Sequence, residues 1–360
     1  MQQLRIPGPT PCPPEILEAI GRQMINHRGK EFADIIRDIT PKLKEVFQTK
    51  NDVFLLTGSG TGGMEAAVVN TLSPGDKVLA TSCGNFGDRF AEIAEAYGAE
   101  VKHLNFEWGK PVDPDAVRQA LKADSGIKAM LVTHNETSTG VTNDLKSISA
   151  VAKEFDKLIL VDAISGLGSI DLPVDAWQCD VVVTASQKGW MVPPGLAMVS
   201  VSEKAWQAHA KAKMPRYYWD FTLAKDYLEK GQTPTTPAVS VFFGLAVALD
   251  MILAEGLPKL FARHARMADL ARNGAKSMGL SLLPEEKYAS NTITAIRASD
   301  KLNVSKLLQL LENEHGVVLA GGQGSLSGKI FRIGHLGWIT EKDIKEVLDA
   351  IARVIPQASS

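Results

Sequence analysis

Short runs of β-branched and other apolar residues alternate with helical periodicity between about residue 53 and residue 201. The runs are apolar on both faces, which is typical of parallel strands covered by helices on both sides. Seven strands are predicted, at Val53–Thr57, Lys77–Ser82, Glu100–Phe106, Ala129–Thr133, Leu158–Asp162, Val181–Thr184 and Leu196–Val201. Helices are predicted in most of the gaps, at Met64–Leu72, Arg89–Tyr97, Pro114–Ala123 and Leu145–Phe155.

This alternation predicts an α/β fold in which a mostly parallel, seven-stranded sheet forms the middle of a three-layer domain. The last two strands are joined by a short link without an obvious helix. A parallel pair needs a crossover of a dozen or more residues, so we expect one antiparallel strand at this point.

The pattern changes at about residue 257, where a long amphipathic helix, Pro258–Met278, begins. The segments that follow predict a smaller α+β domain, with strands at Thr292–Ile296 and Phe331–Gly334 and helices at Val304–Glu314 and Glu341–Ile355. We therefore expect an N-terminal arm (1–20), a large domain (21–256) and a small C-terminal domain (257–360), with the site in the cleft between the domains. Five prolines between residues 7 and 14 make the arm stiff and extended, so it either crosses a partner surface or is a solvated lead-in.

The amino-acid composition argues against several classes of protein. Of the 360 residues 22% are charged and 45% hydrophobic, and the net charge is −2, which argues against a disordered chain, a coiled coil and a protein that binds nucleic acid. The three cysteines form no CxxC pair and have no histidine at zinc-ligand spacing, so we expect no disulfide framework, no metal site and a cytoplasmic location. The longest apolar run, Ala238–Leu249, is too short to span a membrane, and we expect no signal peptide.

A glycine-rich turn, LLTGSGTGGMEAA, follows the first predicted strand and opens a helix at residues 55–67. It satisfies GxGxxG, but the next strand ends in Thr81–Ser82–Cys83, without the acidic residue that holds a dinucleotide ribose. Free backbone N–H groups at a helix N-terminus bind phosphate more generally, and Ser59 and Thr61 add hydroxyl donors. The turn is interpreted as a phosphate site or as a plain strand-to-helix connection.

Asp162 ends an apolar strand, and Lys188 lies just beyond the next one, 26 positions later. Taken alone, Asp162 is also consistent with a helix N-cap, and Lys188 with a solvated loop charge. The spacing is about one crossover unit, so adjacent parallel strands would direct both side chains into one cavity. Together with a phosphate-binding turn, such a pair suits pyridoxal 5′-phosphate: the amine forms a Schiff base and moves a proton, and the carboxylate keeps the pyridine nitrogen protonated.

With these residues in view, the chain resembles class V aminotransferases of fold type I, in particular alanine–glyoxylate and serine–glyoxylate aminotransferases. The resemblance covers nearly the whole length and rests on six segments: PGPTPCPPEIL, TGSGTGGMEAA, HNETSTGV, VDAISGLGSID, SQKGWMVPPGLAM and FRIGHLG.

The resemblance implies a role for each matching residue. Lys188 would carry the cofactor, Asp162 would pair with its ring nitrogen, and Arg332 would bind the substrate α-carboxylate through two parallel hydrogen bonds. The remaining cofactor contacts would come from Ser59, Gly60 and Thr61 at the phosphate, Gln187 beside the lysine, Thr137 near the phenolic oxygen, and Ile164 and Phe86 on the ring. Thr235 would reach the phosphate from the other subunit of a homodimer with a shared active site, although Gln232 stands where relatives carry a second contact, a tyrosine.

The segment NHRGKEF resembles phosphoserine aminotransferases, in which a His–Arg pair binds a distal anion. His27 and Arg28 therefore contact either the substrate or the dimer interface.

The expected function is transfer of an amino group from alanine or serine to glyoxylate or pyruvate. Three alternatives are an aspartate or phosphoserine donor bound through Arg28, a lyase that uses the same cofactor, and a non-catalytic subunit of a larger complex. A cysteine desulfurase is not expected, because none of the cysteines lies in the C-terminal part of the chain.

Overall fold

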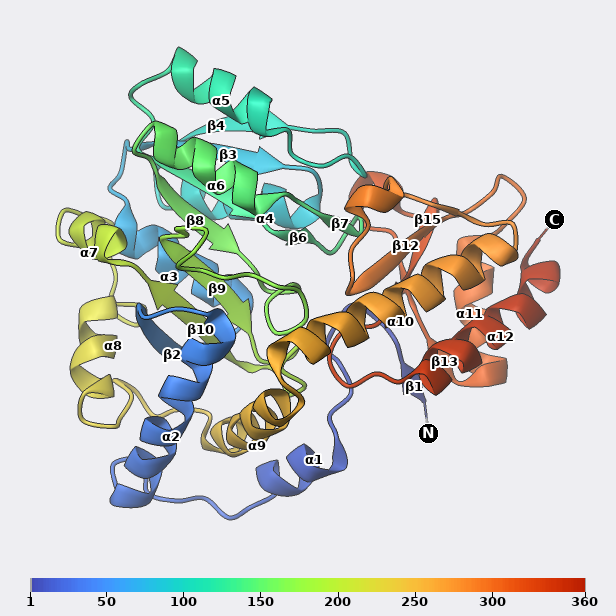
Figure 1. Ribbon diagram of the computed structural model, residues 1–360, viewed down its shortest axis with the longest axis horizontal. Helices are drawn as coiled ribbons and strands as arrows, with labels where there is room; N and C mark the ends of the chain where they lie inside the picture. The colour runs from blue at the N-terminus through green and yellow to red at the C-terminus, as the bar shows by residue number, and fades with distance from the viewer. Residues whose placement is uncertain (1, 360) are drawn as a thin grey trace.

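A seven-stranded sheet lies at the centre of the N-terminal two-thirds of the chain in the computed structural model, which describes residues 2–359 (Figure 1). Its strands, in spatial order, are β2 (Asp52–Gly58), β10 (Gly195–Val201), β9 (Val181–Ala185), β8 (Leu158–Asp162), β5 (Ala129–Thr133), β3 (Lys77–Ser82) and β4 (Glu100–Asn105). β10 runs antiparallel to both of its neighbours, and every other adjacent pair is parallel. The predicted mostly parallel sheet with one antiparallel strand is confirmed.

Helices cover both faces of this sheet, which confirms the three-layer prediction. α3 (Gly60–Thr71) and α4 (Asn85–Ala96) lie on one face, and the other is covered by α1 (Pro14–Ile20), α2 (Lys30–Phe47), α5 (Pro114–Ala123), α6 (Leu145–Glu154) and α9 (Val239–Glu255). Successive strand residues point to opposite faces. Val181 and Val183 of β9 accordingly pack with α3 and α4, whereas Val182 packs in the cluster on the opposite face.

The other elements of this part are short. They are the strands β6 (Asn135–Glu136) and β7 (Val141–Thr142), which pair with each other, and the helices α7 (Glu203–His209) and α8 (Phe221–Leu228). α9 contains the longest apolar run and is mostly buried. Within residues 2–359 no single helix has the length and apolar character to cross a membrane, and α9 with the following helix passes that test only as a pair bent by 89°.

The C-terminal part begins with α10 (Leu257–Ser277) and has a hydrophobic cluster of its own. Its antiparallel sheet has the order β11 (Ser281–Leu282), β12 (Ile293–Arg297), β15 (Ile330–Gly334) and β14 (Ala320–Gly321). α11 (Val304–His315) and α12 (Glu341–Ala358) pack in that cluster. All three predicted helices and both predicted strands of this part are therefore present, and the domain boundaries at residues 20 and 256 stay predictions.

The N-terminal arm packs against the C-terminal part of its own chain. β1 (Gln3–Leu4) pairs with β13 (Val317–Val318), and Figure 1 shows β1 beside β13 and α12. Gly334 N–H donates to the Arg5 carbonyl (2.7 Å), and the Arg5 guanidinium forms an ion pair with Asp343 of α12. The prediction that this arm is a solvent-exposed segment is therefore wrong. Contact of the arm with a partner subunit stays a prediction.

α3 lies so close to the sheet that Gly63 has no room for a side chain. A Cβ there would lie 2.6 Å from Cγ1 of Val183 and 3.0 Å from Cβ of Ala197. We predict that Gly63→Ala lowers the free energy of unfolding by about 1–3 kcal/mol, because the methyl group pushes the helix away from β9 and β10. Thermal unfolding measures the loss. Gly21→Ala is the control, since its Cβ would meet nothing closer than 3.5 Å, and equal melting temperatures for the two variants would contradict the packing argument.

Candidate active site

The turn between β2 and α3 presents free backbone N–H groups at a helix N-terminus. Ser59 is the N-cap of α3, and its Oγ accepts a hydrogen bond from Gly62 N–H (3.4 Å). Gly60 lies against Ile164, whose Cδ1 would be 2.5 Å from a Cβ at that position. Ser59, Gly60 and Thr61 thus form the first turn of the helix, where an anion is stabilised by unpaired N–H groups and the helix dipole.

Asp162 and Lys188 lie beside each other at one edge of the sheet. Asp162 is the last residue of β8, which pairs in parallel with β9, and Lys188 follows three residues after the end of β9. The 26-residue spacing therefore did correspond to adjacent parallel strands. Both side chains are buried, with 3% of Asp162 and 9% of Lys188 exposed.

Burial shifts the pKa of Asp162 strongly. The loss of hydration raises the pKa of Asp162 to about 7, and the negative charge of Glu136 adds to the rise. Ile164 N–H, which donates to Oδ1 of Asp162 (2.9 Å), opposes this shift, as do the cationic side chains of Lys188 and Arg89. The carboxylate is thus poised to hold or give up a proton near neutral pH.

The amine of Lys188 is shifted in the opposite direction. Burial lowers the pKa of Lys188 to about 8, and the positive charges of Arg332 and Arg89 contribute to the decrease, while the Asp162 carboxylate opposes it. A substantial fraction of this amine is therefore neutral, and hence nucleophilic, at physiological pH.

The N-terminal arm covers Lys188. Its Nζ donates to the carbonyl of Pro7 (2.6 Å), and a Cβ at Gly8 would lie 2.6 Å from the same nitrogen. Thr10 fixes the lysine backbone: its Oγ1 donates to the Lys188 carbonyl (3.0 Å) and its N–H to the Gln187 carbonyl (3.1 Å). The sequence predicted no role for the arm at the site, and the match of PGPTPCPPEIL to the family was the only signal for one.

The loop that contains Thr137 is held in place by a fully buried carboxylate. Glu136 accepts hydrogen bonds from the N–H groups of Phe86 (3.1 Å) and Gly87 (3.0 Å) and from both N–H (3.0 Å) and Oγ (2.6 Å) of Ser138. Thr137 itself donates through Oγ1 to Ser165 Oγ (2.8 Å). Glu136, for which no role was predicted, therefore joins the start of α4 to the Thr137 loop.

Arg332 is a buried cation held by backbone carbonyls. Its Nε and Nη2 both donate to the Gly321 carbonyl (3.0 and 2.8 Å), and Nη1 donates to the Thr137 carbonyl (2.9 Å). Burial lowers the pKa of Arg332 to about 10. Among the described residues no carboxylate forms an ion pair with it, so the guanidinium charge is available to an anionic ligand.

Three further predicted contacts are near the same edge of the sheet. Phe86 is half-buried in the first turn of α4, with the guanidinium of Arg89 5.0 Å from its ring centroid. Ile164 is half-buried two residues after Asp162. Gln187 Oε1 is buried without a hydrogen-bond partner in the part of the chain that the structure describes.

Arg28 and Thr235 belong to a different cluster. Arg28 donates to the carbonyls of Thr233 (2.6 Å) and Pro234 (3.1 Å), and Thr233 Oγ1 donates to the Thr235 carbonyl (2.8 Å). No hydrogen bond or ion pair within residues 2–359 joins this cluster to Lys188. The roles predicted for Arg28, His27 and Thr235 stay predictions.

Several curated proteins are similar to this chain over nearly all of its length. The "Soluble hydrogenase 42 kDa subunit" of Anabaena cylindrica is 44% identical to this chain. The match covers 98% of this chain and 92% of the relative. An L-aspartate–glyoxylate aminotransferase of Paracoccus denitrificans is 39% identical (93% and 86% covered), and a serine–glyoxylate aminotransferase of Methylorubrum extorquens is 35% identical (97% and 89%).

A solved structure has the same fold over nearly the whole chain. The crystal structure of alanine–glyoxylate aminotransferase from Nostoc sp. superposes with a TM-score of 0.95 at 30% identity, covering 98% of this chain and 95% of the other. The family model described as aminotransferase class-V matches residues 6–343, which include every residue of the cluster around Lys188. The chain belongs to the class-V aminotransferase family, whose members share the fold type I architecture, and is an enzyme of the transaminase type.

Proposed function

We propose that this aminotransferase uses pyridoxal phosphate to move the amino group of alanine or serine to glyoxylate or pyruvate. The observation that carries the proposal is the buried cluster of Lys188, Asp162 and Arg332. A nucleophilic amine and a carboxylate lie at one edge of the central sheet, and β15 adds a guanidinium that forms no ion pair within residues 2–359. Relatives and a neighbour named for serine–glyoxylate and alanine–glyoxylate transfer support the substrates.

The residues present fit the cofactor that the family implies. The first turn of α3 offers N–H groups to a phosphate, and the buried Gln187 Oε1 lacks a hydrogen-bond partner beside Lys188. Phe86 and Ile164 supply apolar surface for an aromatic ring, and Asp162 supplies a carboxylate for a ring nitrogen. When bound, pyridoxal phosphate withdraws electrons from the substrate Cα, which makes the Cα proton removable.

With the cofactor bound, each residue of the cluster would have a separate role. Arg332 holds the substrate carboxylate through its two-pronged guanidinium, because no carboxylate in the described part of the chain pairs with its charge. Lys188, with its lowered pKa, accepts and returns the Cα proton near neutral pH. Asp162 keeps a proton on the cofactor's ring nitrogen, and the arm around Pro7 and Thr10 keeps water away from the amine.

A homodimer with a shared active site is part of the proposal. Arg28 and the Thr233–Thr235 segment are joined by hydrogen bonds, and within residues 2–359 no hydrogen bond or ion pair links them to Lys188 of the same chain, as expected of groups that serve a partner's site. The cytoplasmic location stays a prediction.

An acidic donor is the second candidate. The relative named for L-aspartate–glyoxylate transfer is 39% identical, against 35% for the serine–glyoxylate relative. Arg28 would then bind the second carboxylate of the substrate.

The test is a screen of the purified protein with pyridoxal phosphate, pairing alanine, serine, aspartate and phosphoserine with glyoxylate and pyruvate. We expect alanine or serine with glyoxylate to give glycine fastest. Fastest turnover with aspartate or phosphoserine would favour the second candidate. Release of ammonia without a new amino acid would indicate a lyase, and no turnover with any pair would favour a non-catalytic subunit.

We predict that Arg332→Lys lowers kcat/KM at least about tenfold for every donor and acceptor, because all of them carry an α-carboxylate and lysine cannot form the two-pronged contact. Arg28→Ala should change kcat/KM for alanine or serine little. If an acidic donor is the true one, the same variant should lose about 2 kcal/mol or more with that donor.

One set of kcat/KM values decides this prediction, with sedimentation as the check on dimerisation. A loss with Arg28→Ala confined to acidic donors would overturn the alanine or serine assignment. Equal activity of Arg332→Lys and the unmodified chain would remove Arg332 from the substrate site.

We also predict that the Lys188 amine titrates near pH 8. Labelling by a neutral aldehyde with cyanoborohydride should rise as the pH passes through about 8, since only the deprotonated amine reacts. Asp162→Asn should move this midpoint to lower pH, because the carboxylate raises the pKa of Lys188. Lys110, whose pKa is raised by Glu285, is the internal control and should react only at higher pH. A Lys188 midpoint near 10.5 would contradict the described burial.

A further inference from the structure

Trp219 lies against the glycine turn that opens α3. A Cβ at Gly62 would lie 2.6 Å from Cη2 of Trp219, and a Cβ at Gly58 would lie 2.9 Å from the same atom. Carbon atoms pack best at about 3.5–4.0 Å, so a side chain at either glycine would displace the indole. Gly62 is not one of the GxGxxG glycines, and contact with Trp219 is the physical reason for a glycine at this position.

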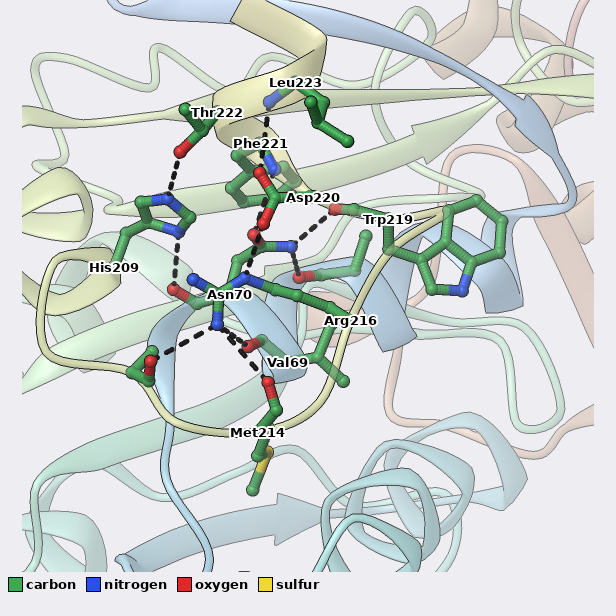
Figure 2. Close-up of polar contacts among 12 residues, drawn as sticks. Val69, Asn70, His209, Met214, Arg216, Trp219, Asp220, Phe221, Thr222 and Leu223 are labelled. Carbon is green, nitrogen blue, oxygen red and sulfur yellow. Dashed lines mark hydrogen bonds and ion pairs between the residues drawn. The ribbon is translucent and has the colours of Figure 1, made fainter. Parts of the chain in front are cut away.

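Asn70, in the last turn of α3, holds the backbone of Trp219. Figure 2 shows Asn70 at the centre of a polar network, with the Trp219 ring pointing away from it. The fully buried amide donates to the carbonyls of Trp219 (2.7 Å) and Ala66 (2.8 Å) and accepts from Phe221 N–H (3.0 Å). The helix whose first turn contacts the indole thus binds the backbone of the same residue at its other end.

Arg216 and Asp220 attach the same segment at further points. Arg216 forms an ion pair with Asp220 (3.0 Å) and donates to the Val69 carbonyl of α3 (3.1 Å). Asp220 is also the N-cap of α8, accepting from Leu223 N–H (3.1 Å). The segment before α8 is therefore fixed to α3 on both sides of Trp219 (Figure 2).

Two more contacts complete the attachment. His209 bridges the Asn70 carbonyl (3.2 Å) and Thr222 Oγ1 (2.7 Å). The hydroxyl of Tyr218 donates to the Thr57 carbonyl (3.1 Å), at the end of β2 just before the turn. The network therefore holds a rigid ring against one side of the turn, while Ile164 contacts Gly60 on another.

We infer that Trp219 is a positioning residue for the phosphate subsite. Its ring fixes the backbone of the turn so that the N–H groups at the start of α3 converge on one anion, and the Asn70 and Arg216 contacts act through it. The inference rests on the proposed function, in which this turn binds the cofactor phosphate.

The test compares two ligands that differ only in the phosphate, pyridoxal phosphate and pyridoxal. Dissociation constants are measured by absorbance for the unmodified chain and for Trp219→Ala, Trp219→Phe and Tyr217→Ala. Trp219→Ala should weaken pyridoxal phosphate about tenfold, equivalent to roughly 1.4 kcal/mol, and leave pyridoxal unchanged. Trp219→Phe should fall between, because a smaller ring fills part of the space. Tyr217 is 79% exposed in the same segment, and its variant should bind both ligands normally.

A double-mutant cycle tests the contact itself. Gly62→Ala should weaken pyridoxal phosphate in the unmodified chain but add little in the Trp219→Ala background, where the methyl group has space. Equal losses for both ligands, unchanged affinity of both Trp219 variants, or full additivity in the cycle would each overturn the inference. Failure of the unmodified chain to bind pyridoxal phosphate would instead overturn the proposed function, and this inference with it.

Discussion

The parallel pairing of β8 with β9 places a carboxylate and an amine, both buried, at the same edge of one sheet. Burial disfavours the charge on each group, so the pKa of Asp162 rises to about 7 and that of Lys188 falls to about 8, while their mutual attraction partly offsets both shifts. Other parts of the site lie at the same edge of the sheet. α3 begins there after β2, and the 134–138 loop follows β5.

The C-terminal part and the arm complete the same site from outside the sheet. Arg332 lies on β15, and its guanidinium reaches the Thr137 carbonyl across the two parts of the chain. The arm binds β15 through the hydrogen bond between Gly334 N–H and the Arg5 carbonyl. Two residues later, the Pro7 carbonyl accepts a hydrogen bond from Lys188. A substrate carboxylate at Arg332 would therefore bind where the two parts of the chain meet.

The fold was largely predictable because its signals are local. Apolar runs of five to seven residues and helical periodicity are readable in short windows, and most predicted bounds lie within a residue or two of the observed ones. Lys77–Ser82, Ala129–Thr133 and Leu158–Asp162 match the observed strands residue for residue. α2 was not predicted, although its apolar residues from Phe32 to Phe47 recur at helical spacing. α8 is short, and its place depends on contacts with α3.

The site was predictable in part. The spacing of Asp162 and Lys188 indicated adjacent strands, and the roles of Arg332 and Thr137 came only from the resemblance. Three contacts were not predicted, because each joins residues that are 50 to 181 positions apart. They are Lys188 with the Pro7 carbonyl, Glu136 with the Phe86 N–H, and Trp219 with Gly62. No periodicity in a short window carries such information.

We propose that Lys188 is the residue that binds the cofactor covalently. The direct measurement is to incubate the protein with pyridoxal phosphate, reduce it with borohydride, digest it and locate the modified lysine by mass spectrometry. We expect the phosphopyridoxyl mass on the peptide that contains Lys188, and none on that peptide when Lys188 is replaced by alanine. The label on another lysine, or no label at all, would contradict it.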